Sequence, residues 1–218
     1  MPSSRSRFRW ESGYLRVGRI RDADLRLHWS LLIVAIVMIG IGSGVALIAL
    51  VLLVLAHELG HFVLARRCGL AVYRIDITPI GGTCTFDATS ATPWDRAVIA
   101  WGGVLAQLAL FVPALIFVKL VPMPTGPVEH YLSQVLAVLL PLNLMMLLFN
   151  LVPMAPLDGH LAWGVVPMIP QRITHWRDLR AARRRRDERL AERHRSNVAG
   201  AARARGLRVI RSDDDSMR

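Results

Sequence analysis

The sequence predicts an all-α membrane protein with about four transmembrane helices, a short β-hairpin or re-entrant loop between the second and the third, and an unwound fourth helix. Three observations support this prediction. The chain of 218 residues is 53% hydrophobic and has a mean hydropathy of +0.39, with apolar runs too long for an ordinary soluble domain. The net charge is nevertheless +11, because the charged residues collect toward the two ends. Two prolines, Pro153 and Pro156, interrupt the last long apolar segment.

The charge distribution divides the chain into three regions: a basic N-terminal segment of residues 1–26, a membrane domain of residues 27–170 and an Arg-rich tail of residues 171–218. Because Lys and Arg favour the cytoplasmic side of a membrane, we expect both termini to lie in the cytoplasm. We expect the tail to lie against the anionic lipid bilayer. Nucleic-acid binding by the tail is the weaker alternative, since it rests on charge alone and no recognised motif accompanies it.

The first apolar run, residues 31–56, carries no charge and is long enough for one membrane span. A glycine-rich break inside it favours two helices instead, at about 28–41 and 44–67. Both basic tails can lie on one side only if the number of spans is even, and this split gives four spans where an unbroken helix gives three. Trp29 is typical of a membrane interface. His28 beside it could reach a functional site or be only an interface residue.

Residues 70–87 change in character, because β-branched residues recur in an alternating pattern at Val72, Ile75 and Ile77. Pro79 and the two glycines after it mark a turn. This pattern predicts a short β-hairpin or a re-entrant loop. Non-helical backbone at membrane depth must lie against protein or water, so we expect this segment to be covered on at least one side.

Two further apolar segments follow. The third span is predicted over residues 93–120, where Gly102 and Gly103 belong to a small-residue stripe suited to close helix packing. The loop of residues 121–129 contains no basic residue, as an external loop should. The fourth span is predicted over residues 130–152.

The strongest chemical signal is the stretch His57-Glu58-Leu59-Gly60-His61 at the end of an apolar run. Residues four apart lie on one face of a helix, so the two histidines can bind one metal ion together. Glu58 stands where a general base for a hydrolytic water belongs. An ionisable cluster at membrane depth is a functional-site hypothesis in its own right. The pattern therefore predicts a zinc-dependent hydrolase.

A catalytic zinc site takes three protein ligands and keeps one position open, so a third ligand is needed. Two prolines after Asn150 cannot continue a helix, and a carboxylate on the resulting unwound segment needs a partner. Asp158 is therefore the best candidate. The other aspartates at 76, 87 and 95 flank turns or a helix start, and His160 is too close in sequence to join Asp158 at one ion. Asn150 could hydrogen-bond a substrate or could simply cap the end of the helix.

Several stretches of the sequence between about residues 24 and 166 match known motifs: His57-Glu-Leu-Gly-His61, Asn150-x-x-Pro153-x-x-x-x-Asp158-Gly159, His28-Trp29-Ser30 and Pro79-Ile-Gly81-Gly82. Together they resemble the site-2 protease family of intramembrane zinc metalloproteases, and the last two resemble the branch that includes the sporulation-factor proteases of bacteria. The resemblance implies a bacterial plasma-membrane protein that cleaves transmembrane segments of single-span substrates in regulated intramembrane proteolysis.

The resemblance also assigns roles to individual residues. It implies that His57, His61 and Asp158 bind one Zn²⁺ ion, that Glu58 is the catalytic base, and that Asn150 helps to position the substrate. An unpaired strand edge in the predicted hairpin could hold an extended substrate by strand addition, or the hairpin could be a plain connection.

The sequence also departs from the family in ways that affect regulation. His160 stands where glycine is commoner, and no PDZ or CBS domain fits the chain. We therefore expect a regulatory membrane partner or the supply of substrate to control activity. The alternative function is a non-enzymatic metal-binding membrane protein, or a degenerate relative that binds transmembrane helices without cleaving them.

Overall fold

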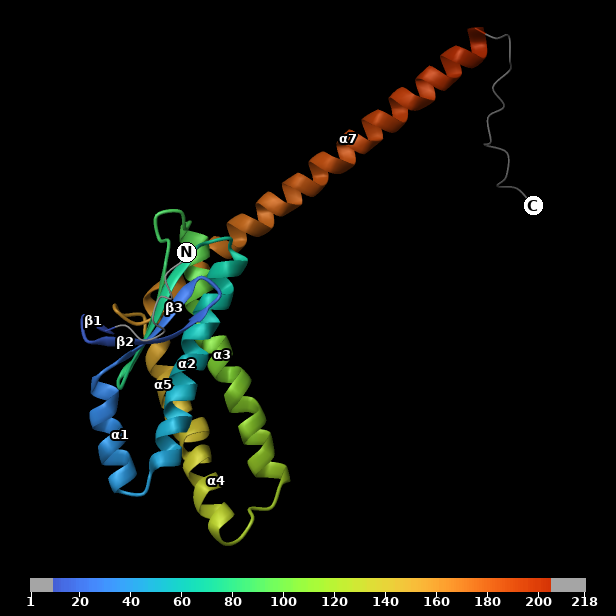
Figure 1. Ribbon diagram of the computed structural model, residues 1–218. Coiled ribbons are helices and arrows are strands. Elements are labelled where there is room, and N and C mark those ends of the chain that lie inside the picture. The colour runs from blue at the N-terminus through green and yellow to red at the C-terminus, as the bar shows by residue number, and fades with distance from the viewer. Residues whose placement is uncertain (1–9, 205–218) are drawn as a thin grey trace, which may run out of the picture. The chain divides into compact units, whose positions relative to one another are not determined.

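The computed structural model describes residues 10–204, which divide into one compact unit that ends at Val166 and a second that begins at Pro167 (Figure 1). The second unit is one helix, α7. The first unit combines helices with a small sheet. Its strands are β1 (Trp10–Glu11), β2 (Tyr14–Ile20), β3 (Ala23–His28), β4 (Val72–Thr78) and β5 (Gly81–Phe86). The helices are α1 (Ser30–Gly40), α2 (Gly44–Arg67), α3 (Pro93–Leu120), α4 (Pro127–Ala137), the π-helix η1 (Val138–Leu142), α5 (Asn143–Asn150), α6 (Gly159–Ala162), the 3-10 helix η2 (Trp163–Val165) and α7 (Met168–Ala204).

Within the described residues, three helices are long and apolar enough to cross a membrane: α2, α3 and the continuous stretch from α4 through α5, Pro127–Asn150. The predicted split of the first apolar run is confirmed, and α2 and α3 have the predicted bounds. The helix before the split, α1, has only 11 residues. At about 1.5 Å per residue it is too short for a ~30 Å hydrocarbon core. The prediction of about four spans is therefore supported for three helices, with α1 as a short apolar helix beside them.

The chain enters and leaves the helical bundle at the same end, the end at which the sheet lies. Strand β3 leads into α1 and pairs with β4, which follows α2, so α1 starts at the end where α2 finishes. Helix α3 then runs away from the sheet, and α4–α5 returns toward it (Figure 1). The α1–α2 turn and the α3–α4 loop lie at the opposite end. This up-and-down path keeps the entry and exit of the bundle together even though α1 is short.

The prediction of an all-α protein is wrong, because the first unit contains a five-stranded sheet in the order β1-β2-β3-β4-β5. The hairpin predicted in residues 70–87 is confirmed as the antiparallel pair β4–β5. Strands β2 and β3 extend it through the parallel pairing of β3 with β4. The boundary drawn at residue 27 passes through β3, so the segment before it does not stand apart from the domain. Leucine and arginine alternate at residues 25–27, a strand signal that the high positive charge obscured.

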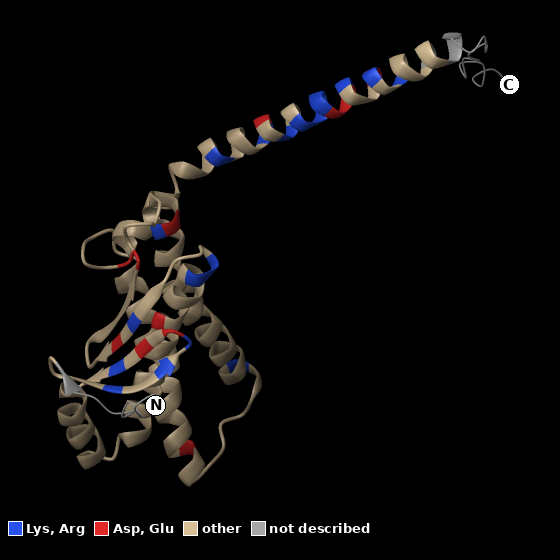
Figure 2. Cartoon of the chain, turned by 45° about the horizontal axis from the view of Figure 1, so that its top comes forward, with Lys and Arg blue, Asp and Glu red and all other residues tan. Residues whose placement is uncertain are grey.

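Charged residues gather on the strands of the first unit, whereas its helices carry few of them and mostly near their ends (Figure 2). Between β3 and β4, the Arg26 guanidinium donates two hydrogen bonds to the Asp76 carboxylate, at 2.6 and 2.7 Å. Both side chains are nearly buried, at 12% and 9% exposure. The Arg26 guanidinium also lies 4.8 Å from the centre of the Tyr14 ring in β2. This ion pair attaches the N-terminal strands to the part of the sheet that was predicted.

The apolar core of the unit lies where α2 and α3 meet the sheet. It includes Val54, Phe62, Ile75, Ile77 and Ile99, all of them buried. The two helices approach unusually closely where Gly60 faces Gly102. A Cβ at either glycine would collide with the backbone of the other helix, so this approach requires glycine at both positions. The predicted small-residue stripe of α3 therefore serves close packing, and this contact fixes α3 beside the histidines of α2.

Candidate metal centre

Three side chains from two distant parts of the chain converge at one point. The Nε2 atoms of His57 and His61 lie 3.1 Å apart. The Oδ2 atom of Asp158 lies 3.1 Å from His57 Nε2 and 3.2 Å from His61 Nε2. In the described part of the chain this is the group of His, Cys, Asp and Glu side chains whose ligand atoms are close enough to hold a metal ion. The structure thus brings together the three predicted ligands.

The donor set suits zinc. Imidazole nitrogens and carboxylate oxygens are zinc ligands, and ligand bonds of about 2.0–2.1 Å in a tetrahedral site place neighbouring donor atoms roughly 3.3 Å apart. The observed separations of 3.1–3.2 Å are close to that value. With three protein donors, a tetrahedral ion keeps one coordination position for water or substrate, as catalytic zinc sites do.

Helix α2 supplies the two histidines because their spacing of four residues places them on one face. His61 is oriented by a hydrogen bond from its Nδ1 to the backbone oxygen of Ile99 in α3, at 2.8 Å. A bond of this kind fixes which ring nitrogen faces a metal. The His57 ring lies directly against Gly103 of α3, where a Cβ would collide with the ring. Helix α3 therefore positions both imidazoles, one by a hydrogen bond and one by close packing.

Asp158 reaches the histidines because the chain leaves helical geometry after Asn150. Residues 151–158 form turns, and α6 begins only at Gly159. Two tryptophan side chains fasten this segment: Trp101 Nε1 donates to the oxygen of Ala162 at 3.0 Å, and Trp163 Nε1 donates to the oxygen of Leu151 at 2.7 Å. The predicted unwinding is confirmed.

Glu58 lies beside the three donors and under strand β5. It is 3% exposed, and its carboxylate lies against the backbone amide of Cys84. A Cβ at Gly82 would collide with the Glu58 side chain, so the strand can approach this closely only with glycine at that position. The pKa of the Cys84 thiol is raised to about 12, chiefly because the thiol is shielded from solvent and secondly because the Glu58 charge lies nearby. Neither Gly82 nor Cys84 was predicted as part of the site, although the Gly81-Gly82 pair was a visible signal of close backbone approach.

These groups line one cavity of about 460 Å³ between α2, β5 and the unwound segment. Asn150, predicted to position a substrate, also lines it, together with Ile80 at the tip of the β4–β5 hairpin. Ile80 is 99% exposed. The cavity is large enough for a short stretch of extended peptide and brings both the metal-ligand group and Glu58 to its wall.

The two other histidines considered from the sequence lie elsewhere. His28 bonds to Ser30 Oγ at 2.6 Å through its Nδ1 and packs against the rings of Tyr14 and Trp29. It does not line the cavity, so the structure gives it no role in the metal-ligand group, and its place at a membrane interface stays a prediction. His160 is exposed and does not line the cavity. Only Gly159 separates it from Asp158, and yet the His160 side chain is exposed whereas Asp158 faces the cavity.

Known proteins match this chain in sequence and in fold. The model of "Peptidase family M50" matches residues 45–125, which include both histidines and Glu58. Rip3 of Mycobacterium tuberculosis, whose name includes the words zinc metalloprotease, is 32% identical over a 164-residue alignment that covers 66% of this chain and 41% of Rip3. Stage IV sporulation protein FB of Bacillus subtilis is 29% identical over 141 residues, which are 63% of this chain and 46% of that protein. The chain thus spans less than half the length of these curated relatives.

A solved structure, the site-2 protease from Methanocaldococcus jannaschii, has the same fold. It superposes with a TM-score of 0.54 at 24% identity and covers 71% of this chain and 72% of its own.

Proposed function

Because this chain is similar to the peptidase M50, or site-2 protease, family, we propose that it is an intramembrane zinc endopeptidase. Its substrates would be single-span membrane proteins, cut within or near their transmembrane segments as a step in regulated intramembrane proteolysis. We place it in a bacterial plasma membrane with both termini in the cytoplasm. The common end at which the helical bundle begins and finishes supports this orientation.

The observation that carries the proposal is the convergence of three donor atoms within 3.2 Å of one another, beside a buried glutamate in a shared cavity. In this assignment His57, His61 and Asp158 hold one Zn²⁺ ion. When bound, zinc supplies Lewis-acid chemistry: it acidifies water to near neutral pH and polarises a scissile carbonyl.

Glu58 serves as the general base and then the general acid. Its carboxylate accepts a proton from the attacking water and passes it to the nitrogen of the scissile peptide bond. The nitrogen therefore leaves as a neutral amine and not as an anion. Its position directly after His57 on α2 keeps it at the wall of the same cavity. Burial beneath β5 limits the directions in which the carboxylate can swing, which favours one productive geometry.

Substrate binding would involve Asn150 and strand β5. In the described part of the chain β5 pairs only with β4, so its other edge presents backbone donors and acceptors. A transmembrane helix must unwind before a protease can cut it, and an unwound segment can add to such an edge as a further strand. Asn150 faces the same cavity and can hydrogen-bond the peptide backbone. A regulatory membrane partner would control access to this cavity.

The test compares Glu58→Gln with Glu129→Gln, a matched change at an exposed glutamate in the first turn of α4. Each variant is purified for zinc analysis and co-expressed with a single-span model substrate. We expect Glu58→Gln to retain zinc and lose cleavage by roughly 10²-fold or more, and Glu129→Gln to match the wild type. Cleavage that survives in Glu58→Gln would refute Glu58 as the catalytic base, and absence of cleavage by zinc-loaded wild type would favour the second candidate, a metal-binding relative without protease activity.

A separate measurement tests the ligands. Asp158→Ala should lose zinc, because only two protein donors would remain. Full zinc occupancy in this variant would contradict the ligand assignment.

A further inference from the structure

Helix α7 carries an amphipathic face that the proposed peptidase site does not use. Ile169, Ile173 and Trp176 are separated by four and three residues and are 42–57% exposed. Continuing the same spacing reaches Arg180 and then Arg183. At about 100° per residue, these five residues stay within a stripe roughly 80° wide along four turns. We call this stripe the apolar-basic face. Asp187, four residues later, falls on the same side and ends it.

The apolar and basic residues of this face contact each other. The Arg180 guanidinium lies 3.8 Å from the centre of the Trp176 ring. An arginine stacked on an exposed tryptophan presents one amphipathic surface, with the ring and the arginine stem below and the charged group at its rim. Tryptophan and arginine together are typical of helices that lie at a membrane surface.

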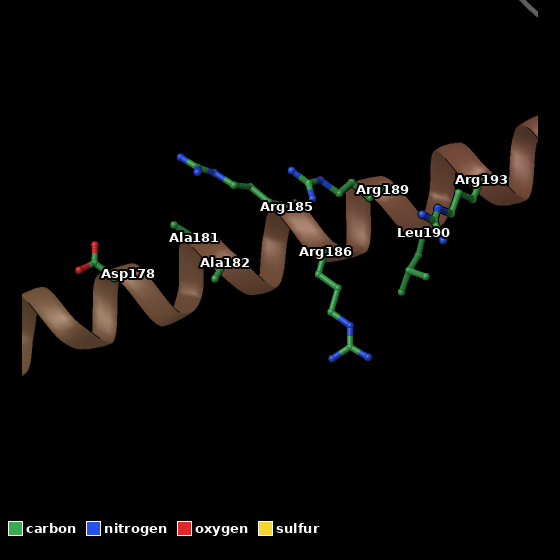
Figure 3. A pocket seen from close by; sticks show the side chains of 8 residues that line it. All are labelled: Asp178, Ala181, Ala182, Arg185, Arg186, Arg189, Leu190 and Arg193. Atoms are coloured by element: carbon green, nitrogen blue, oxygen red, sulfur yellow. The ribbon is translucent and has the colours of Figure 1, made fainter.

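Charge alone does not define a face on α7. Arginines outnumber acidic residues along the helix (Figure 2), and the run of residues 183–186 is distributed around its whole circumference. Figure 3 shows Arg185 and Arg186 leaving the helix on different sides. The asymmetry comes from the exposed apolar residues, and they lie with Arg180 and Arg183 and not with Arg185.

We propose that α7 lies on an anionic lipid surface, with the apolar-basic face toward the bilayer. Ile169, Ile173 and Trp176 would enter the boundary between headgroups and acyl chains, and Arg180 and Arg183 would bind lipid phosphates. The bilayer is always within reach, because α7 begins two residues after the unit that contains three helices of membrane-crossing length. Such tethering raises the effective concentration of lipid for a helix that would bind weakly alone.

Two other occupants fit the face less well. A second copy of α7 packed in parallel on this face would bring Arg180 and Arg183 against the same arginines of its partner, and an antiparallel copy would bring these charges against the apolar end of the face, so either arrangement costs energy. A nucleic acid would engage phosphate-binding arginines on any side and leaves the exposed Ile169, Ile173 and Trp176 without a role. Anionic lipid satisfies the apolar and the basic residues at once.

The experiment measures hydrogen exchange of α7 in the full-length protein. The protein is reconstituted in nanodiscs of phosphatidylcholine or of phosphatidylcholine mixed with anionic phosphatidylglycerol. We expect amides of residues 168–183 to exchange roughly tenfold more slowly in the anionic discs, and added salt to reduce the difference. Equal exchange in the two lipids would overturn the proposal.

Two double variants test the face itself. Arg180→Glu with Arg183→Glu reverses two charges on the apolar-basic face. Arg185→Glu with Arg189→Glu makes the same change in charge about 160–200° away around the helix. We expect the first pair to abolish the lipid-dependent protection and the second pair to retain most of it. Equal loss in both pairs would mean non-specific attraction and would refute a docked face.

A final arm adds a fluorescent single-stranded oligonucleotide to protein in the neutral discs at the same salt concentration. Protection of α7 by the oligonucleotide but not by anionic lipid would assign the helix to nucleic acid instead. None of these measurements depends on peptidase activity, so they can fail while the proposed function holds, and the reverse is also true.

Discussion

Replacing Gly103 with alanine should remove zinc from the site while leaving most of the fold intact. A Cβ at this position would lie closer than 3.0 Å to three atoms of the His57 ring, where ordinary contact begins at 3.4 Å. Because Gly103 is on a helix that is fixed against α2, the imidazole is the group that must move. A displacement on the order of 1 Å is expected, and metal sites tolerate only about ±0.2 Å in ligand distance. The ring would therefore leave the position in which its Nε2 faces His61 and Asp158.

The size of the effect can be bounded. Overpacking by one methyl group costs about 1–3 kcal/mol, and losing one of three zinc ligands should lower affinity by at least 10²-fold, as even weaker outer-shell changes cost 10–100-fold. The assay is metal content after dialysis against a zinc buffer, with thermal unfolding of the same samples in detergent. Gly40→Ala is the matched control, because a Cβ there meets nothing within 4 Å.

Gly102→Ala provides a second comparison, one residue away. Its Cβ would collide with the backbone of Gly60 and with the backbone nitrogen of His61, but not with an imidazole ring. It should therefore lower the unfolding temperature more than Gly103→Ala does. If Gly103→Ala bound zinc with unchanged affinity, or if both variants lost zinc only in proportion to their lost stability, the positioning role of Gly103 would be wrong.

Three further predictions follow from other parts of the unit. Arg26→Ala should destabilise the protein by about 3 kcal/mol, since it leaves the buried carboxylate of Asp76 poorly compensated. Arg19→Ala, which removes the exposed ion pair of Arg19 with Asp24, should cost less than about 1 kcal/mol. Denaturant titration in detergent distinguishes the two variants, and equal effects would contradict the role of the buried pair. The Cys84 thiol, with its pKa raised to about 12, should stay protonated at about pH 8 and react with iodoacetamide more slowly, by at least about tenfold, in the folded than in the denatured protein. Equal labelling rates in the two states would contradict the raised pKa. A chelator should lower the unfolding temperature of the wild type but not of Asp158→Ala. An equal shift in both proteins would show that the chelator does not act on stability through this site.

The sequence predicted the helices and the convergence of His57, His61 and Asp158 because both depend on local or strongly restricted patterns. The bounds 44–67 and 93–120 are marked by a glycine-rich break, a proline entry and charged ends, and uncharged segments of that length have few alternatives. Asp158 could be selected because an unwound, apolar segment seldom carries a carboxylate without a partner.

The strands of residues 14–28 were missed for a physical reason. The pairing of β3 with β4 joins segments about 50 residues apart, through the parallel register of Arg26 with Asp76, and β2 joins the sheet only through β3. A basic segment looks solvated until the partner carboxylate is known, and that partner lies on a strand whose own position depends on α2. The covering of Glu58 by β5 was hidden in the same way, because only the folded sheet brings Gly82 to the glutamate.

The arrangement of glycines explains why the histidine-glutamate pattern alone does not make such a site. Gly103 admits the His57 ring, Gly82 admits Glu58, and Gly159 lies where a Cβ would collide with the backbone of Leu151 and Val152 in the turn that carries Asp158. The His57 ring and the Glu58 side chain therefore occupy space that a methyl group on the facing glycine would fill, and the backbone of the turn before Asp158 does the same at Gly159. These glycines come from α3, β5 and the start of α6, so three separate elements must approach α2 or the unwound turn together before the donors can meet. A chain with the same five-residue motif but alanine at these positions would keep the ligands in its sequence and lose the geometry that makes them a site.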